Sequence, residues 1–277
     1  MAIDGRSYST IKVGNGTTVK IEYRDFAPST AALAKEYALQ GYPDRYAVFT
    51  EHQATTDITG TKLRKGALEK GIFISLILRP SFFIAQAASI GTMSVVALSQ
   101  ALESYTTKGI GISWVSDIYC DGAKIGGTQI EGKLKDSNSY DYIIVTFAAK
   151  IDEKNFPPRL KDSVKMVFEK DNLSVGMMMA KTVLDKFFTA YSNIKSVESH
   201  HKYYTARFAL TDAKIKYIDD KGKKRFATVV GIDKESLALI IKTRFGQPIQ
   251  VFKSSRVIIP GRIRINGRNK KREDKKS

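Results

Sequence analysis

The pattern of apolar and polar positions divides the chain into an α+β part and a smaller part made of short strands. In the first part, runs rich in β-branched and aromatic residues predict strands. These runs cover residues 19–23, 46–52, 71–78 and 140–149. Helical spacing of apolar residues, or an N-cap signal, predicts helices over residues 31–40, 82–105 and 173–191. The second of these helices is apolar or small nearly all round, so we expect it to lie buried against the sheet.

Beyond residue 205 the pattern changes to short strands separated by glycine-containing turns. The expected strands cover residues 206–210, 213–217, 226–232, 237–242 and 249–259. Five such strands favour a small β-barrel of SH3-like type. We therefore expect three parts: a larger domain over residues 1–200, the small barrel over residues 205–260, and a basic, disordered tail over residues 261–277.

The segment from residue 111 to 131 carries the clearest candidate chemistry. An Asp-Gly pair between β-prone runs predicts two strands joined by a tight turn. Such a hairpin brings an acid, Asp117, and an amine, Lys124, from neighbouring strands to one place. Gly126 and Gly127 in the second strand are expected to let a ligand approach the backbone.

Composition changes the picture mainly through charge. The formal net charge of +17 indicates an acidic partner, such as nucleic acid, an anionic surface or an acidic protein. No apolar run is long enough to span a bilayer, and the first 15 residues lack the apolar core of a signal peptide. A single cysteine, Cys120, and three histidines without metal-ligand spacing favour a soluble, cytoplasmic protein without a disulfide framework or a metal site.

The basic tail is expected to be a solvated segment rather than a specific nucleic-acid arm. It carries many lysines and arginines and almost no apolar residues. Aromatic residues are not interleaved with the basic ones there, as a surface that stacks bases requires. A weak nucleic-acid contact through this tail is compatible with any function of the rest of the chain.

The order of these elements, together with the hairpin, resembles the biotin–protein ligases from about residue 19 to residue 260. The hairpin residues that match the family pattern are Trp114, Asp117, Tyr119, Lys124, Gly127 and Glu131. A second match is Val-Gly-Ile-Asp-Lys-Glu-Ser-Leu at residues 230–237. The resemblance implies a mixed β-sheet flanked by helices, of the class II synthetase and biotin–lipoate ligase type, and an SH3-like C-terminal domain. No DNA-binding helix-turn-helix is expected ahead of it.

The resemblance also implies site residues. Those expected to bind biotin are Ser29, Thr30, Gln53, Trp114, Lys124 and Gly127. Those expected near the nucleotide are Gly60, Lys62, Arg64 and Lys150. Lys124 would contact both the biotin carboxylate and the phosphate of the acyl-adenylate. Asp117 would help to place Mg²⁺ or orient the acceptor lysine, which makes these two the expected catalytic residues.

The chain departs from the family pattern on the nucleotide side. After Gln53-Ala54 the family has a loop rich in glycine and arginine, whereas this chain has Thr-Thr-Asp-Ile-Thr-Gly-Thr-Lys at residues 55–62. Before Asp117 the family lysine, proline and asparagine are missing. The half of the site that binds the acyl group is therefore better retained than the half that binds ATP.

Several of these residues also have a purely structural interpretation. Lys124 can be a strand lysine beside a turn, and Asp117 a turn-stabilising or ion-paired residue. Ser29 and Thr30 can serve only as helix caps, Trp114 only as core packing, and Gln53 as an exposed strand end.

The leading hypothesis is a biotin–protein ligase that uses ATP and Mg²⁺ to form biotinyl-AMP. The acyl group would then pass to a lysine of a carrier, such as the acidic biotin carboxyl carrier domain of a carboxylase. One alternative is a ligase-fold protein that has lost adenylation and serves as a binding or regulatory module. Another is a lipoyl or octanoyl transferase, which would need Cys120 or another thioester partner. A homodimer is compatible with each of these.

Overall fold

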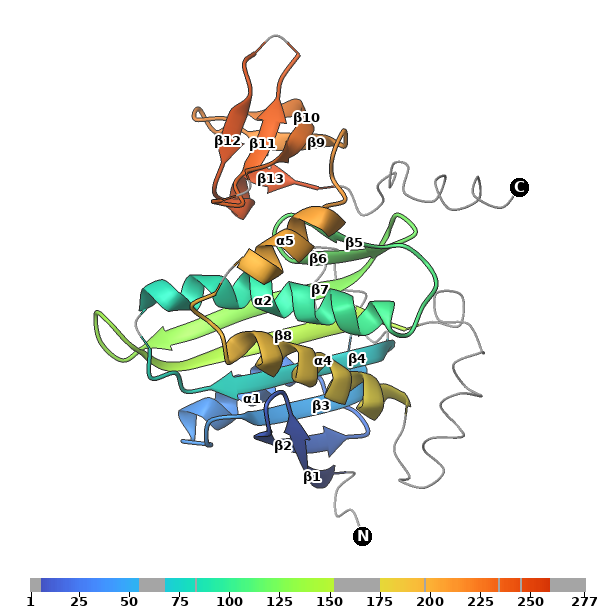
Figure 1. Cartoon of the computed structure of the whole chain (residues 1–277), viewed down its shortest axis with the longest axis vertical. Coiled ribbons are helices and arrows are strands. Elements are labelled where there is room, and N and C mark those ends of the chain that lie inside the picture. Colours follow the sequence, from blue (N-terminus) through green and yellow to red (C-terminus); the bar gives the residue numbers. More distant parts are fainter. Residues whose placement is uncertain are drawn as a thin grey trace.

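The computed structural model describes residues 6–54, 68–82, 84–151, 175–196, 198–233, 235–244 and 246–259. Figure 1 shows a large mixed sheet with helices on both faces and a smaller sheet at the C-terminal end. The strands of the large sheet are β1 (Arg6–Val13), β2 (Thr17–Arg24), β3 (Tyr46–Ala54), β4 (Leu68–Leu78), β5 (Ile110–Ser113), β6 (Asp117–Cys120), β7 (Ala123–Leu134) and β8 (Tyr140–Lys150). Their order is β1-β2-β3-β4-β8-β7-β6-β5. Only β2 and β3 pair in parallel, so the sheet is mixed.

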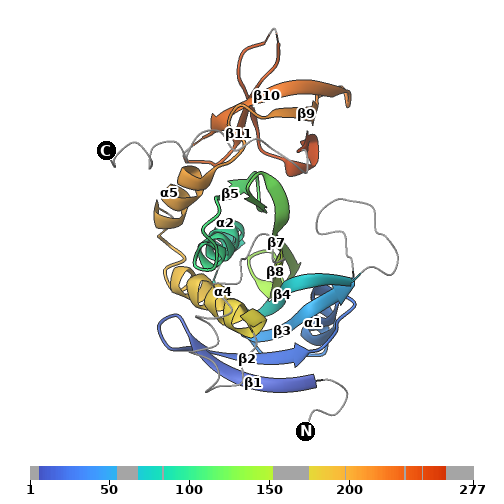
Figure 2. The ribbon, with the colours of Figure 1, turned by 90° about the vertical axis from the view of Figure 1, so that its right-hand side faces the viewer.

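Helices cover the two faces of this sheet unequally. One face carries α1 (Thr30–Leu39), and the other carries α2 (Ile84–Glu103) and α4 (Val175–Tyr191). Figure 2 shows α2 and α4 together on the side opposite α1. The main core lies under α2 and α4, where apolar residues of alternate strand positions pack against both helices. Within the described residues, no helix has the length and apolarity that crossing a membrane requires.

A smaller core lies under α1. Ala34, Tyr37 and Ala38 of the helix pack against Val48 and Ile77 of the sheet. At the first turn, the Ser29 side chain accepts a hydrogen bond from the Ala32 amide (3.2 Å), which is the N-cap that the sequence predicts. This contact fixes where α1 begins over the sheet.

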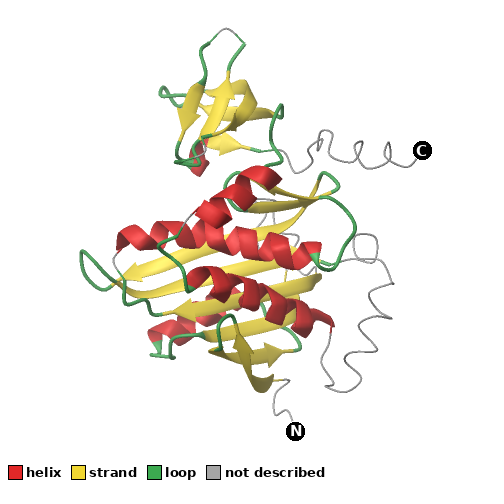
Figure 3. Ribbon diagram, viewed as in Figure 1, coloured by secondary structure: helices red, strands yellow, loops and turns green. Residues whose placement is uncertain are grey.

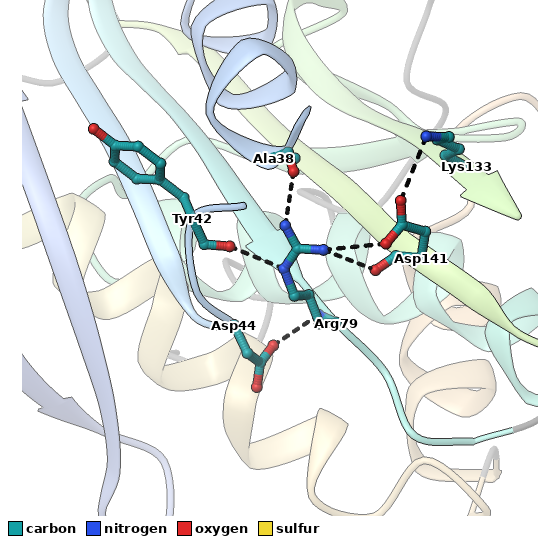
Figure 4. A network of polar contacts seen from close by, with 6 residues as sticks. All are labelled: Ala38, Tyr42, Asp44, Arg79, Lys133 and Asp141. Atoms are coloured by element: carbon teal, nitrogen blue, oxygen red, sulfur yellow. Dashed lines mark hydrogen bonds and ion pairs between the residues drawn. The ribbon is translucent and has the colours of Figure 1, made fainter. Parts of the chain in front are cut away.

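Arg79 holds the other end of α1. Its guanidinium donates to the carbonyl oxygens of Ala38 (2.7 Å) and Tyr42 (2.9 Å). A third bond reaches the Asp141 carboxylate on β8 (3.3 Å), and Lys133 of β7 approaches the same carboxylate (Figure 4). Because the last carbonyl groups of a helix lack partners within the helix, an arginine that reaches them fastens the helix end to the sheet.

The C-terminal sheet has five strands in the order β12-β11-β10-β9-β13. They are β9 (Lys214–Ile218), β10 (Lys224–Ile232), β11 (Leu239–Lys242), β12 (Ile249–Val251) and β13 (Val257–Ile258), with the short 3-10 helix η1 (Ser254–Arg256) before the last. Figure 3 shows these strands as a unit of sheet and loops next to α5 (Glu198–Arg207). Each strand pairs antiparallel with its neighbours, and β12 and β13 are the two edges of the described sheet.

Most of the predicted strands and helices agree with the structure, although the strand predicted over residues 249–259 is divided into β12, η1 and β13. The strand β1 was not predicted, because its residues are mostly small or polar and exposed at the sheet edge. Residues 206–210, predicted as a strand, form the end of α5 and one isolated bridge between Phe208 and Ile112. The segment around residue 200, where the domain boundary was expected, lies in α5, and the division into domains stays a prediction. The start of the helix predicted from residue 173 lies outside the described residues.

Candidate functional site

The segment predicted as a two-stranded hairpin is a three-stranded meander. The Asp121-Gly122 turn is present, with φ angles of 47° and 78°, which is the left-handed pair that a tight hairpin turn requires. The first predicted strand is divided, because β5 ends at Ser113 and β6 begins at Asp117, and these two residues pair directly. Apolar residues continue through the bend between them, so the sequence pattern shows no break there.

Lys124 and Asp117 meet across β6 and β7. The Lys124 Nζ lies 2.8 Å from Asp117 Oδ2, and the two side chains are 15% and 25% exposed. A register shift after Ile118 places Lys124 opposite Tyr119 and leaves Asp117 opposite Gly127. The hairpin therefore brings the predicted acid and amine together, and the amine is directed at a carboxylate rather than into bulk solvent.

Gly126 and Gly127 are required by the packing of the chain itself. A Cβ on Gly127 would lie 2.5 Å from the Ser116 carbonyl oxygen, and a Cβ on Gly126 would lie 2.0 Å from the Ala148 carbonyl oxygen. Both distances are too short for any side chain. Neighbouring strands thus approach closely at both glycines, and the expected approach of a ligand to the backbone there stays a prediction.

A buried row of polar side chains lies at the start of α1. Gln53 Oε1 accepts from the Thr30 amide (2.9 Å) and from the Thr30 hydroxyl (3.1 Å). Ser75 lies 3.0 Å from Thr30 Oγ1 and 3.0 Å from Thr146 Oγ1. All four side chains are buried, so Gln53 is not the exposed strand end that was the alternative for it. Sequence analysis did not single out Ser75 or Thr146, although each is a lone hydroxyl residue within an apolar strand.

The strand register places the buried polar row and the Lys124–Asp117 pair on one face of the sheet. Ser75 pairs with Thr146 across β4 and β8, and Thr146 pairs with Gln129 of β7. Two residues along the same face, Gly127 pairs with Asp117. Residues directly opposite one another on paired strands project to the same side. The first turn of α1 and the Lys124–Asp117 pair therefore belong to the same face, where α1 lies mainly over β3, β4 and β8 and its Lys35 reaches Glu131 of β7.

Tyr204 of α5 supports the bend that carries Asp117. Its hydroxyl donates to the Val115 carbonyl oxygen (3.0 Å), and the ring is 1% exposed. Burial, with a smaller effect of the Asp117 carboxylate, raises the pKa of Tyr204 above its ordinary value. Burial and Asp117 raise the pKa of Tyr119 in the same way. Both phenols therefore stay neutral, and Tyr204 remains a hydrogen-bond donor to the bend.

Trp114 lies on the side of the bend that faces the C-terminal sheet. Its Nε1 donates to the Leu237 carbonyl oxygen (2.8 Å), and its ring packs with Leu210, Ile215 and Leu239. The ring is 5% exposed. This position agrees with core packing beside the site, which was the structural interpretation of this residue.

The expected nucleotide residues are only partly described. Gly60, Lys62 and Arg64 lie outside the described residues. Lys150 is the exposed last residue of β8, one position beyond the Gly126–Ala149 pair, so it shares one end of the sheet with Lys124.

Among the described residues, no three metal-ligating side chains come together. Mg²⁺ that accompanies a nucleotide commonly needs only one or two carboxylates besides phosphate and water. Asp117 fits that role as a single carboxylate.

No protein-family model matches the chain. Two curated proteins with significant similarity are the bifunctional ligase/repressor BirA of Bacillus spizizenii, 27% identical over 160 residues, and BirA of Bacillus subtilis, 26% identical over 160 residues. Each alignment covers 56% of this chain and 49% of BirA. The chain thus spans about half the length of the curated relatives it matches.

Solved structures extend the similarity of fold over most of the chain. A biotin protein ligase variant from Aquifex aeolicus in complex with biotin has a TM-score of 0.62 at 17% identity, covering 87% of this chain and 98% of that one. The Aquifex aeolicus ligase with biotin and ATP has a TM-score of 0.59 at 18% identity, covering 86% and 97%. The biotin acetyl coenzyme A carboxylase synthetase from Helicobacter pylori has a TM-score of 0.53 at 14% identity, covering 83% and 98%. The chain is therefore similar in sequence to BirA over about half of its length and has the fold of the biotin protein ligases.

Proposed function

We propose that this chain is a biotin–protein ligase-like enzyme that activates biotin with ATP and transfers it to a lysine of a carrier protein. The observation that carries the proposal is the Lys124–Asp117 pair, held at 2.8 Å between β6 and β7. The sequence similarity to BirA supports the same assignment.

Activation of biotin joins two anions, so the protein must suppress their repulsion. The biotin carboxylate attacks the α-phosphate of ATP, biotinyl-AMP forms, and pyrophosphate leaves. A lysine held near both groups offsets the carboxylate charge and the charge that develops on the phosphate oxygens. Asp117 holds the Lys124 amine in place, and in the transfer step its carboxylate is suited to orient the incoming lysine amine.

The buried row of polar side chains at the start of α1 is suited to the polar ring of biotin. Thr30, Gln53 and Ser75 are already joined by hydrogen bonds within the protein. A ligand that exchanges one of these bonds for its own meets a preorganised site and does not need to order the side chains. Ser29 caps α1 and fixes the position of Thr30.

ATP and Mg²⁺ complete the proposed reaction. Lys150 supplies a positive charge at the end of the sheet near Lys124. Gly60, Lys62 and Arg64 are proposed to contact the nucleotide from the segment between β3 and β4. Lys62 and Arg64 would supply the positive charge that the arginines supply at this place in the family.

Release of pyrophosphate tests the proposal. The chain is mixed with biotin and ATP, and pyrophosphate is measured with and without an acceptor carrier domain that is then blotted for biotin. Lys124→Gln should lower the rate by about 100-fold or more, since loss of one charged donor in such a site costs about that factor. Lys20→Gln, an exposed strand lysine on β2, is the matched control and should react normally. Failure of the unaltered chain to bind biotin in calorimetry would end the proposal.

A second candidate is a ligase-fold protein that binds its ligand without forming the adenylate. The sequence of residues 55–62 favours it, because charge-assisted donors of the family loop are missing there. It predicts biotin binding in calorimetry with no pyrophosphate release. A lipoyl or octanoyl transferase through Cys120 has less support, since that thiol is 1% exposed.

We also infer that the C-terminal strands form an SH3-like barrel, because residues of five short antiparallel strands contribute to one apolar core. An acidic carrier domain suits the strongly basic chain as acceptor. A homodimer, a weak nucleic-acid contact through the basic tail and a cytoplasmic location stay predictions, and the tail lies outside the described residues.

A further inference from the structure

The C-terminal sheet has one face that packs inward and one that faces solvent. Ile215, Tyr217, Ala227 and Val229 point into the core of the sheet, together with Trp114. The alternate positions point outward and include four exposed lysines. We call the outward positions Lys214, Lys216, Lys224, Phe226 and Lys242 the outer face. The five strands, all of them described, contain no aspartate or glutamate.

An exposed aromatic ring lies among these lysines. Phe226 is 75% exposed, the most exposed large apolar side chain in the described part of the chain. It pairs with Lys216 across β10 and β9, and Lys216 pairs with Ile258 across β9 and β13. The Lys216 Nζ lies 5.3 Å from the centre of the Phe226 ring. The Lys216 amine thus lies over one face of the ring, and most of the Phe226 side chain is still exposed to solvent.

A second row of the outer face is basic as well. Thr228 pairs with Lys214 on one side and with Lys242 on the other. This row is the next one on the same face of the sheet after the row of Phe226. Since neighbouring strands lie about 5 Å apart, these lysines form a band across three strands.

The positive charge of the outer face is not neutralised by neighbouring carboxylates. Within the described residues, none of its four lysines forms an ion pair with an acidic side chain. The nearest acids in sequence are Asp212, for which the described residues include no ion pair, and Asp219 and Asp220, in the turn between β9 and β10. The latter two are paired with Arg225 (3.0 Å) and Arg256 (2.8 Å), respectively. The band therefore attracts an acidic partner.

We propose that the outer face binds single-stranded nucleic acid, a function beyond the ligase activity. A base stacks on Phe226, and the lysines beside it contact the phosphates that flank the base. This combination of an exposed ring and a positive band is the one by which sheets bind single strands without sequence preference. Carboxylates of an acidic protein would use the lysines but would leave the exposed part of the ring in water, so the ring favours nucleic acid.

Fluorescence anisotropy with a labelled 20-nucleotide oligothymidine tests the proposal on the full chain. Phe226→Ala should weaken binding by about tenfold, the effect expected for loss of one stacked base. Phe226→Tyr should bind as the unaltered chain does. The double variant Lys214→Ala/Lys216→Ala should reduce the slope of log K against log salt by about 1.4, since two phosphate contacts are lost.

The matched control is Lys12→Ala/Lys20→Ala, which removes the same charge from the exposed side of β1 and β2. The basic tail is present in every variant, so its contribution cancels in the comparison. The proposal fails if Phe226→Ala binds as tightly as the unaltered chain, or if the two double variants lose affinity equally. Competition by polyglutamate that depends on the outer lysines but not on Phe226 would also overturn it in favour of an acidic protein.

Discussion

The Lys124–Asp117 pair shows how a site residue depends on its partner. A lysine amine that is 15% exposed keeps its charge at low cost only with a carboxylate next to it. The carboxylate is placed by the bend after β5, and the bend is held by the buried Tyr204. Two parts of the chain that are far apart in the sequence, the meander and α5, thus fix one nitrogen atom.

We expect Asp117→Asn to separate binding from catalysis. The amide oxygen can still accept a hydrogen bond from Lys124, so the fold and biotin affinity should change little. The remaining bond lacks the carboxylate charge and holds the Lys124 amine less firmly, so pyrophosphate release should slow by about 10- to 100-fold. Calorimetry with biotin and a pyrophosphate assay measure the two effects.

Asp121→Asn is the matched control for this substitution. It is the same change at the hairpin turn, where the backbone φ of 47° is one that asparagine adopts readily. Equal rates for the two variants would contradict the role of Asp117.

At the residue scale, the sequence identifies candidate site residues more reliably than it identifies the side chains that they contact. The Asp-Gly turn predicts that Asp117 and Lys124 meet, and they do. The hydroxyl groups of Ser75 and Thr146 meet only because β4 lies beside β8. The paired residues of these two strands are 65 or more positions apart in the chain. Strand order of this kind depends on a crossover that local patterns do not contain.

At the scale of elements, α1 is held at both ends by single side chains. Ser29 fixes its first turn and Arg79 its last. The hydroxyl row at its start keeps its position only if the helix does not slide along the sheet. Arg79 is therefore a remote determinant of the site, joined to it through the length of one helix (Figure 4).

We expect Arg79→Ala to destabilise the protein by about 1–3 kcal/mol, since two carbonyl groups lose a charged donor. Urea unfolding measures this change, and hydrogen exchange should show faster exchange at the C-terminal end of α1. Lys133→Ala is the control, because it removes the other cation from Asp141 and leaves the helix end intact. Equal losses of stability in the two variants would mean that the Asp141 ion pair matters rather than the helix contacts.

Elements with a strong local signal were predicted, and those fixed by tertiary contacts were not. The helix α2 is apolar all round and the turn at Gly122 has a distinctive sequence, so both follow from local pattern. The edge strand β1 is exposed along most of its length and has no alternating apolar face. In α5 the sequence is polar, and the helix is stabilised by packing against α2 and β5.

At the scale of the whole molecule, one bend joins the two sheets. Trp114 leaves the large sheet and packs in the C-terminal core, while Tyr204 of α5 bonds to the next residue of the bend. The same α5 carries His200, which is 4% exposed and whose Nε2 has no hydrogen-bond partner among the described residues. The connection between the sheets thus contains a buried group that acid can charge.

Burial, with a smaller effect of His201, lowers the pKa of His200 from 6.5 to about 4. The folded state therefore keeps His200 neutral where the unfolded state already binds a proton. Above about pH 6.5 this group does not lower the free energy of unfolding. As the pH falls from there towards 4, the free energy of unfolding decreases because only the unfolded state binds the proton. The loss amounts to about 3 kcal/mol, since each unit of pKa shift corresponds to about 1.4 kcal/mol.

Urea unfolding at pH 7.0, 5.5 and 4.5 checks this expectation. His200→Phe keeps an aromatic ring but removes the titrating group, so its free energy of unfolding should fall less over this range than that of the unaltered chain. His201→Phe serves as the control and should keep most of the dependence, because His201 is less buried than His200. Any fixed loss of packing in either variant shifts the curve without changing its slope. An unchanged slope in His200→Phe would show that this histidine does not cause the acid sensitivity of the connection between the sheets.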